Sequence, residues 1–205
     1  MHVHTNHSKD GRSSVKEVLE AAIRAGLDAI AITDHDTVSG SLEALEIVRD
    51  EHMRIKVITG IEVSTSDGHL LVYGVKKDID PGMSMIETVR TARKLGGLSA
   101  IAHPFQFYRH GCVKFWFAKY VDAVEVLNAK YVFGICNRIS RIIARHYGKP
   151  GIAGSDAHSA GEVGKAVTVI RGSELFEQIL KGNTEVRGSR QSLLSWPRIA
   201  RLKVF

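Results

Sequence analysis

Histidines and carboxylates recur in short clusters along this 205-residue chain. His2 and His4 stand two residues apart, and side chains at that spacing in a strand point to the same side, so both imidazoles can bind one metal ion. Asp156 and His158 repeat this spacing near the other end of the chain. Each cluster alone is a weak signal, because a single histidine is more often structural than a ligand. The other residues of this kind are Asp10, His35, Glu62, His69 and His103.

Some of these side chains lie within three residues of the end of a short apolar run. His35 follows residues 29–32, and His103 follows residues 98–102. Glu62 lies between Ile61 and Val63, so its carboxylate faces inward and needs a partner, which either a metal ion or a buried salt bridge would supply. A donor set of imidazoles and carboxylates without thiolates suits Zn, Mn or Fe at a hydrolytic centre.

Apolar runs and helical patterns alternate, which predicts an α/β protein with largely parallel strands. We expect helices at 14–25, 42–52, 83–95, 114–119, 131–147 and 175–181. We expect strands at 27–33, 57–65, 69–75, 98–102, 123–127, 152–153 and 166–170. A barrel and an open doubly wound sheet both match this order. The clusters fall where strands end, which favours the barrel, and no Gly-rich loop has Rossmann or Walker spacing.

The bulk composition indicates a soluble, cytoplasmic protein. The chain is 44% hydrophobic and 24% charged, and its apolar runs are too short to span a membrane. No signal peptide is expected, because His2 and His4 stand where its apolar stretch would have to be. Cys112 and Cys136 are expected to be free thiols. The net charge of +6 suits anionic partners such as phosphate esters or nucleic acid, and five of the basic residues lie in a run without acids at 187–203.

Taken in order, the motifs resemble the PHP family, named for polymerase and histidinol phosphatase. They are His-x-His, Asp-Gly, Thr-Asp-His-Asp, Gly-x-Glu, His, His-Pro and Ser-Asp-x-His, between residues 2 and 158. The resemblance implies a distorted, TIM-like seven-stranded (β/α) barrel, which we expect over residues 1–185. We expect residues 186–205 to form a basic C-terminal tail packed on it. It also implies two to three divalent metal ions, which are Mn, Zn or Fe, with Mg as a further option.

The same resemblance implies three ligand sets. The first consists of His2, His4, Glu62 and Asp156. The second consists of Asp10, His35 and His158, with His7 as the alternative to Asp10. The third consists of His69 and His103, with Glu62 as a bridging ligand.

Catalytic and substrate-binding roles are hypotheses at this stage. Asp156, His35 and His158 are candidates for proton transfer, and Asp34 or Asp36 could orient His35, although a helix cap explains Asp36 equally well. In the loop 105–110, Arg109 could bind a second phosphate, and Phe107 or Tyr108 could stack on a base or pack on the barrel rim. Asn128 and Lys130 are weaker candidates for substrate binding.

These observations predict a metal-dependent phosphoesterase acting on a small phosphorylated substrate, most simply the phosphomonoester of a nucleotide or nucleoside bisphosphate. One alternative is a histidinol phosphate phosphatase. Another is a metal-dependent exonuclease or oligonucleotide phosphodiesterase with short nucleic acid as substrate. A non-catalytic RNA-binding barrel is disfavoured, because such a protein is expected to have lost ligands. No membrane partner is expected, and the sequence does not indicate an oligomeric state.

Overall fold

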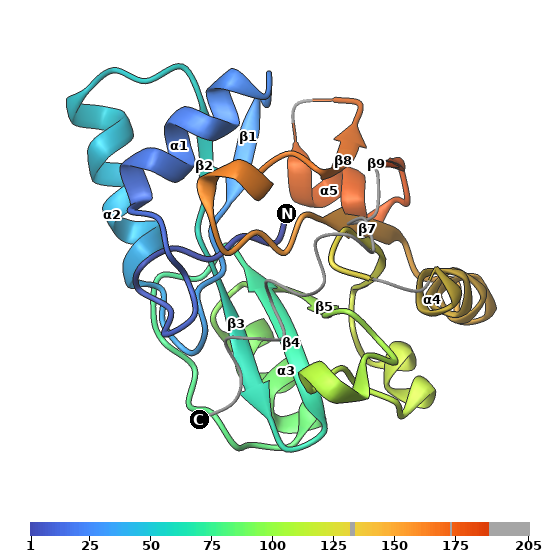
Figure 1. Ribbon diagram of the computed structural model, residues 1–205. Helices are drawn as coiled ribbons and strands as arrows, with labels where there is room; N and C mark the ends of the chain where they lie inside the picture. The colour runs from blue at the N-terminus through green and yellow to red at the C-terminus, as the bar shows by residue number, and fades with distance from the viewer. Residues whose placement is uncertain (132–133, 173, 189–205) are drawn as a thin grey trace.

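The computed structural model describes residues 1–131, 134–172 and 174–188 of the chain. In its first layer, helices α1 (Val15–Arg24) and α2 (Ser39–Asp50) pack against each other beside two parallel strands, β1 (Ala29–Ala31) and β2 (Lys56–Ile58) (Figure 1). A capping box starts α1: the Ser14 hydroxyl accepts from the backbone N–H of Glu17, and the Glu17 carboxylate accepts from the backbone N–H of Ser14 at 2.8 Å.

A five-stranded sheet forms the centre, in the order β3-β4-β5-β6-β7. Strand β4 runs antiparallel to both neighbours, whereas β5, β6 and β7 are parallel. The expectation of largely parallel strands is therefore correct only for part of the sheet, and the single strand expected at 57–65 is two strands separated by Thr59. The bounds are β3 (Gly60–Thr65), β4 (Gly68–Tyr73), β5 (Leu98–Ile101), β6 (Ala123–Asn128) and β7 (Gly151–Gly154).

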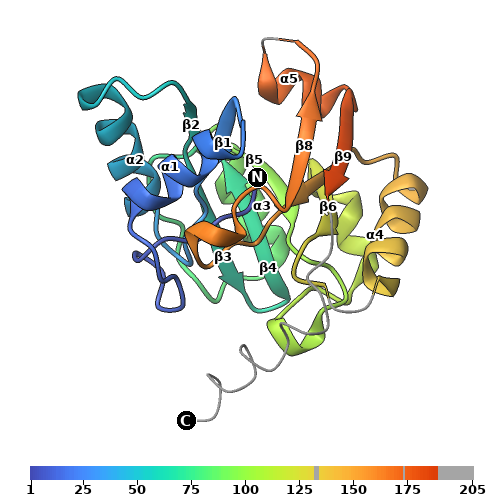
Figure 2. The ribbon, with the colours of Figure 1, turned by 45° about the horizontal axis from the view of Figure 1, so that its top comes forward.

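Two helices cover this sheet and a hairpin extends beyond it. Helix α3 (Met85–Lys94) packs on β3, β4 and β5, and α4 (Ile135–His146) packs on β6. The antiparallel pair β8 (Ala166–Ile170) and β9 (Thr184–Gly188) lies beside β7 (Figure 2). Helix α5 (Leu175–Leu180) contacts β8. Three short 3-10 turns complete the described elements: η1 (Phe107–Arg109), η2 (Phe115–Lys119) and η3 (Ala160–Glu162).

The described strands do not close into one seven-stranded barrel. Their ladders form three separate sheets. Isolated backbone contacts nevertheless join the sheet edges at one end. Residues 2–4 bond on one side to the segment after β7, where His4 N donates to Ala157 O at 2.8 Å. On the other side Thr33 N donates to Val3 O at 2.8 Å, and Glu62 N donates to Asp34 O at 3.1 Å. The segments that carry the polar motifs thus meet at this end through single bonds instead of ladders.

The hydrophobic core lies between the sheets and their helices. One cluster joins α3 and α4 to the central sheet, and a second joins α1 and α2 to β1. A third, which includes Leu71, Tyr73 and Ile152, lies between the central sheet, β1 and α5. Burying a side chain of this size contributes about 1.5–3 kcal/mol, so these clusters fix the strands that carry the polar residues.

Three further predictions concern the C-terminal tail, the membrane and the cysteines. Residues 186–188 of the predicted C-terminal tail belong to β9, and residues 189–205 lie outside the described part of the chain. None of the helices in the described ranges has the length and apolar character needed to cross a bilayer. Cys112 is buried and Cys136 is half-buried, and both are free thiols, as expected.

Candidate metal centre

The carboxylate of Glu62 lies at the centre of a ring of histidines. Its Oε2 atom is 3.1 Å from Nε2 of both His2 and His4 and 3.4 Å from Nδ1 of His35. Its other oxygen, Oε1, is 3.0 Å from His69 Nδ1 and from His103 Nε2. The two oxygens of one buried carboxylate therefore face two separate groups of imidazoles, which is the arrangement required of a bridging ligand.

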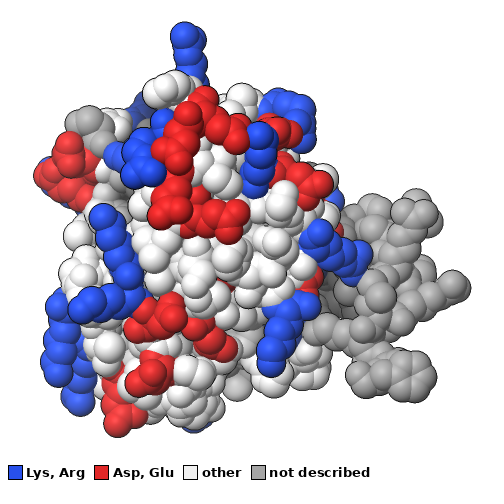
Figure 3. Space-filling view, turned by 90° about the vertical axis from the view of Figure 1, so that its left-hand side faces the viewer, with Lys and Arg blue, Asp and Glu red and all other residues white. Residues whose placement is uncertain are grey.

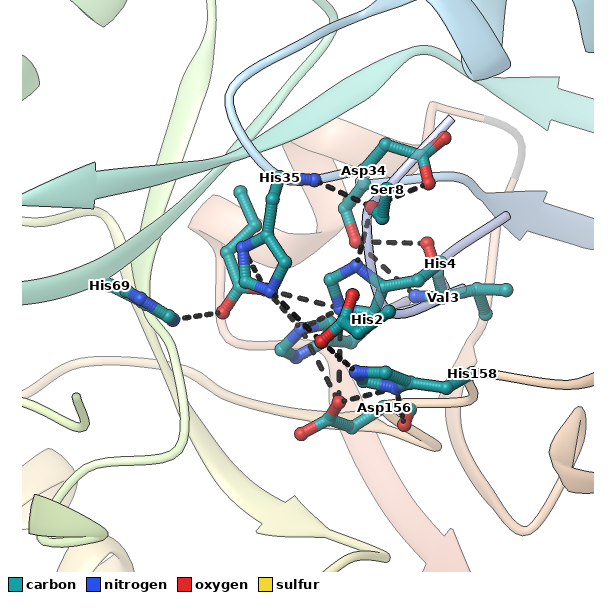
Figure 4. A network of polar contacts seen from close by, with 12 residues as sticks. His2, Val3, His4, Ser8, Asp34, His35, His69, Asp156 and His158 are labelled. Carbon is teal, nitrogen blue, oxygen red and sulfur yellow. Dashed lines mark hydrogen bonds and ion pairs between the residues drawn. The ribbon is translucent and has the colours of Figure 1, made fainter. Parts of the chain in front are cut away.

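The topology explains how distant residues meet here. Glu62 is in β3, and His103 follows the end of β5. His69 lies near the start of β4, and because β4 is antiparallel, its first residues lie beside the last residues of β5. Figure 4 shows His69 and His35 approaching the cluster from one side and His158 and Asp156 from another.

Asp10 and His158 form a second part of the cluster. Asp10 Oδ2 lies 2.9 Å from His158 Nε2 and 3.7 Å from His35 Nε2. His7, the alternative to Asp10, instead places its Nε2 2.6 Å from Glu43 Oε2, away from these histidines. The geometry thus favours Asp10 as the ligand from the first loop.

Ligand atoms converge in four groups within the described residues, and the atoms in each group lie within 4.8 Å of one another. The grouping departs in part from the sets that the family resemblance implies. His4 joins the Asp10 group, and His103 also converges with His2 and Asp156. The groups are His4, Asp10, His35 and His158; His2, His103 and Asp156; His2, His4 and Glu62; and His35, Glu62 and His69.

Two of these residues have a left-handed backbone. The φ angle is 51° at Asp156 and 26° at His103. Residues other than glycine rarely adopt such angles, and the strain is found mostly at functional sites, where the surrounding structure maintains it. Here backbone bonds hold both residues: Asp156 N donates to His2 O at 2.8 Å, and His103 N donates to Glu125 Oε2 at 2.6 Å.

The charge states of most candidate ligands suit ligation at neutral pH. His2 is the exception: burial would lower its pKa, but the surrounding carboxylates, Glu62 foremost, raise it well above its ordinary value. Burial lowers the pKa of His4, His35 and His103, which favours the neutral imidazoles that bind metals. Burial alone would raise the pKa of Glu62, but the surrounding histidines hold it well below its usual value. Burial would likewise raise the pKa of Asp156, whereas the Arg109 guanidinium and His2 lower it well below the ordinary value.

The donor set fits divalent metal ions. Nε2 of His2 and Nε2 of His4 are 3.1 Å apart and both face the Glu62 carboxylate. Six imidazoles and three carboxylates otherwise compete for the same few contacts in a largely buried space. A cation would neutralise the carboxylates and accept the nitrogen lone pairs together. Hard oxygens mixed with imidazoles match the metals expected from the sequence.

Sequence inspection missed one carboxylate, Glu125. It is fully buried in β6, and its Oε1 lies 3.0 Å from His2 Nδ1, on the side of the ring opposite Glu62. Its Oε2 accepts from His103 N and, at 3.0 Å, from the Asn128 amide. The signal was present, because Glu125 is the single acidic residue in an apolar strand.

Asp34 and Asp36 do not contact the His35 ring, so the proposed orienting role is wrong for both. Asp34 holds the first loop: its Oδ1 accepts from Thr5 N at 2.6 Å and from the Ser8 hydroxyl at 2.8 Å. Ser8 Oγ in turn lies 3.2 Å from His4 Nδ1 and accepts from His35 N at 2.9 Å. Asp36 bonds to Ser64 in β3 and caps no helix, because the residue at the N-cap of α2 is Val38.

The proposed substrate residues occupy different environments. Arg109 forms two hydrogen bonds to Asp156, from Nη1 to Oδ2 at 2.6 Å and from Nη2 to Oδ1 at 3.0 Å. Lys130 Nζ lies 2.6 Å from His158 Nδ1. Asn128 is fully buried and donates to Glu125 and Asp156, so it supports carboxylates of the cluster. Phe107 and Tyr108 are 78% and 47% exposed and are not packed against the rim.

Comparisons with known proteins agree with this geometry. Residues 1–191 match the PHP domain family. The uncharacterized protein MJ1587 of Methanocaldococcus jannaschii is 31% identical over 150 residues, which are 68% of this chain and 86% of that protein. The phosphoribosyl 1,2-cyclic phosphate 1,2-diphosphodiesterase of Eggerthella lenta is 37% identical over 83 residues, which are 38% of this chain and 30% of that enzyme. This chain thus matches only a minor part of that enzyme's length.

One solved structure shares the fold over most of the chain. It is a two-domain protein from Bacteroides vulgatus containing a predicted PHP-like metal-dependent phosphoesterase, with a TM-score of 0.74 and 18% identity. The superposition covers 92% of this chain and 63% of the Bacteroides protein. At this identity the likeness concerns the fold alone.

Proposed function

The chain belongs to the PHP domain family, and we propose that it uses two to three divalent metal ions to hydrolyse a compact phosphomonoester, a nucleotide or a nucleoside bisphosphate. The membership confirms the predicted family and its class of enzyme, a metal-dependent phosphoesterase. The observation that carries the proposal is the Glu62 carboxylate, whose two oxygens each face a separate group of imidazoles at 3.0–3.4 Å.

The metal ions would be held by the nine residues that the sequence indicated. When bound, divalent ions supply Lewis acidity and positive charge to the phosphate group. Glu62 would be shared between sites, and Asp10 would close the site that includes His35 and His158. The ligands are His2, His4, Asp10, His35, Glu62, His69, His103, Asp156 and His158.

Proton transfer is assigned to residues at the Asp156 end of the cluster. Asp156 is fully buried and stays ionised beside Arg109, so it can hold a proton donor or a water in place. His158 is paired through Nδ1 with Lys130, whose pKa is lowered by burial. Because His158 Nε2 faces Asp10 in the proposed metal site, a proton delivered here to the leaving oxygen would come from the Lys130 ammonium that His158 holds, and His35 is the third candidate for proton transfer.

Substrate contacts come from the loop after β5. Arg109 is 19% exposed at its side chain, and its position beside Asp156 places a guanidinium next to the cluster. Arginine binds phosphate oxygens in a bidentate manner, so Arg109 is the residue proposed to select a second phosphate. The exposed rings of Phe107 and Tyr108, from the same loop, are available to stack on a base.

Two other substrates within the same chemistry are kept as alternatives: histidinol phosphate, and short nucleic acid cleaved by an exonuclease or phosphodiesterase activity. The non-catalytic RNA-binding barrel is disfavoured, because all nine candidate ligands are present. Localisation in the cytoplasm remains part of the proposal.

A substrate screen tests the proposal. The protein is loaded in turn with Mn, Zn, Mg and Fe and assayed on mononucleotides, a nucleoside bisphosphate, sugar phosphates, histidinol phosphate, a phosphoribosyl cyclic phosphate and a short single-stranded oligonucleotide, at two salt concentrations. We expect the highest kcat/KM on a nucleotide or nucleoside bisphosphate. Rates that rise with oligonucleotide length and fall steeply with salt would replace this assignment with the exonuclease alternative.

A further inference from the structure

The positive charge of the chain is concentrated in two segments. Residues 126–155 contain five Lys or Arg and no Asp or Glu, and residues 187–203 contain five more and again no acidic residue. Together they hold ten of the 28 Lys and Arg and none of the 22 Asp and Glu, so the rest of the chain is net negative. A division of this kind is typical of proteins that bind polyanions.

Helix α4 displays three of these residues on one side. Arg138, Arg141 and Arg145 are exposed and together line a cleft of about 840 Å³ beside β6 and β9. Figure 2 shows α4 at the edge of the molecule next to β9. Gly188, which also lines the cleft, directly follows the first residue of the second basic segment, Arg187. The described start of the second basic segment, residues 187–188, therefore reaches this cleft.

The three guanidinium groups have no carboxylate partner within 4.0 Å in the described part of the chain. Some exposed cations elsewhere are paired, as Lys16 is with Glu51 at 2.8 Å and Arg49 is with Asp50 at 2.8 Å. Figure 3, which views the side of the molecule away from α4, shows acidic and basic side chains interspersed. The helix dipole does not explain the pattern either, because only Arg145 of the three lies in the last turn.

A second cleft extends this basic surface. It measures about 530 Å³, shares Arg141 and Arg145 with the first, and adds Lys149 and Lys181, with Glu185 as its single acidic residue. None of the nine proposed metal ligands lines either cleft. The surface is thus separate from the metal centre.

We propose that the α4 clefts bind the phosphate backbone of a single-stranded nucleic acid. Arg138 and Arg145 are seven residues apart, about 10 Å along the helix, so a chain of phosphates can contact the three arginines in succession. Guanidinium groups bind phosphate oxygens in a bidentate manner. A flexible strand can enter a cleft of this size, whereas the flat surface of a bilayer cannot. This site lies beyond the proposed function, because it is independent of the reaction at the metal centre.

Binding of fluorescent single-stranded RNA and DNA of about 20 nucleotides, longer than one typical strand-binding module covers, tests the proposal by anisotropy. The full metal-loaded chain is compared with the triple variant R138Q/R141Q/R145Q, and the oligonucleotide length is checked on a denaturing gel after each titration. We expect the variant to lose about tenfold or more in affinity near 0.1 M salt, and its slope of log K against log salt to flatten by about two. Activity on a small phosphate ester should not change.

The matched control is R24Q/R49Q/R90Q, which removes the same charge from exposed positions on α1, α2 and α3. It should keep wild-type affinity and salt slope. Equal losses in the two triple variants, or no binding by the wild-type chain at low salt, would overturn the proposal. Arginine-dependent binding to phosphatidylglycerol vesicles without binding to oligonucleotides would overturn it as well. None of these results depends on hydrolysis, so the proposed phosphatase function is tested separately.

Discussion

Glu125 holds the His2 imidazole from behind: its Oε1 is 3.0 Å from His2 Nδ1, while Nε2 of the same ring faces Glu62 at 3.1 Å. Both side chains of the pair are fully buried. A carboxylate in this position fixes the tautomer and the orientation of a ligating histidine. We expect Glu125→Gln to lower metal affinity by about 10–100-fold while the protein remains folded.

Competition with a fluorescent chelator measures this affinity directly. Glu46→Gln, an exposed position on α2, is the matched control and should bind metal as the wild type does. Unchanged metal affinity in the Glu125 variant would show that the pair serves packing only.

Glu62 and His69 differ in how many metal ions they should affect. The purified wild-type chain is expected to hold about two to three transition-metal equivalents. Glu62→Ala should lose more than one of them, because both of its oxygens face imidazoles, whereas His69→Ala should lose one. Elemental analysis after desalting gives the counts. Equal losses would remove the bridging role, and no metal under any loading condition would remove the metal centre itself.

Asp156→Asn keeps the side-chain volume but removes the charge. It weakens a proposed ligand and one of the paired contacts to Arg109. We expect turnover to fall by about 100-fold or more, with an unchanged circular dichroism spectrum. Near-normal turnover by a folded variant would place Asp156 outside the reaction.

Part of the candidate site could be predicted from the sequence, because the motifs that contain His35, His103 and Asp156 come just after apolar segments whose ends are fixed by the core. The sequence did not decide whether Asp10 or His7 is the metal ligand in the loop after His4. The contact of His7 with Glu43 in the structure distinguishes them. The grouping of ligands was not predictable, because His4 and His103 converge with partners far away in the chain.

The features of the fold that could not be predicted from the sequence also depend on contacts between residues far apart in the chain. Strand β4 reads as apolar in either direction, so its antiparallel pairing left no local mark. Residues 2–4 and 33–36 have too few regular contacts to form ladders, and for that reason the described strands of the predicted distorted barrel do not form one closed sheet. The partner of Arg109 was missed because it lies 47 residues away.

Cys112 should make stability depend on alkaline pH. Burial raises the pKa of its thiol to about 11, whereas the unfolded chain ionises near its ordinary value of 9.0. The stabilisation is complete below pH 9 and is lost as pH rises toward 11, because the unfolded state then releases the proton first. Between pH 8.5 and 10 the loss is about 1 kcal/mol.

Urea unfolding of Cys112→Ala at both pH values checks this. The variant should show a smaller decline in the free energy of unfolding than the wild type. Cys136→Ala should differ less, since Cys136 is only half-buried. The same decline in wild type and Cys112→Ala would contradict the assignment.

Arg109 is already paired with Asp156, and this pairing determines how the substrate class can be tested. Its bidentate contact with Asp156 implies that Arg109→Ala lowers turnover on every phosphate ester. The selectivity is therefore measured by the ratio of kcat/KM on a nucleoside bisphosphate to kcat/KM on a mononucleotide. If the guanidinium also binds a second phosphate, the variant should lose a further 1.5–3 kcal/mol, about 10–150-fold, on a nucleoside bisphosphate relative to a mononucleotide.

Relative kcat/KM values for the bisphosphate, the mononucleotide and an aryl phosphate measure this ratio. Lys119→Ala, an exposed cation at the end of η2, is the matched control and should leave all three values unchanged. Arg109→Lys should recover part of the common loss by keeping a positive charge beside Asp156, but little of the ratio, because an ammonium group cannot reproduce the paired donors of a guanidinium. An equal loss on all three substrates would confine Arg109 to positioning Asp156 and would leave the second phosphate without a recognised partner.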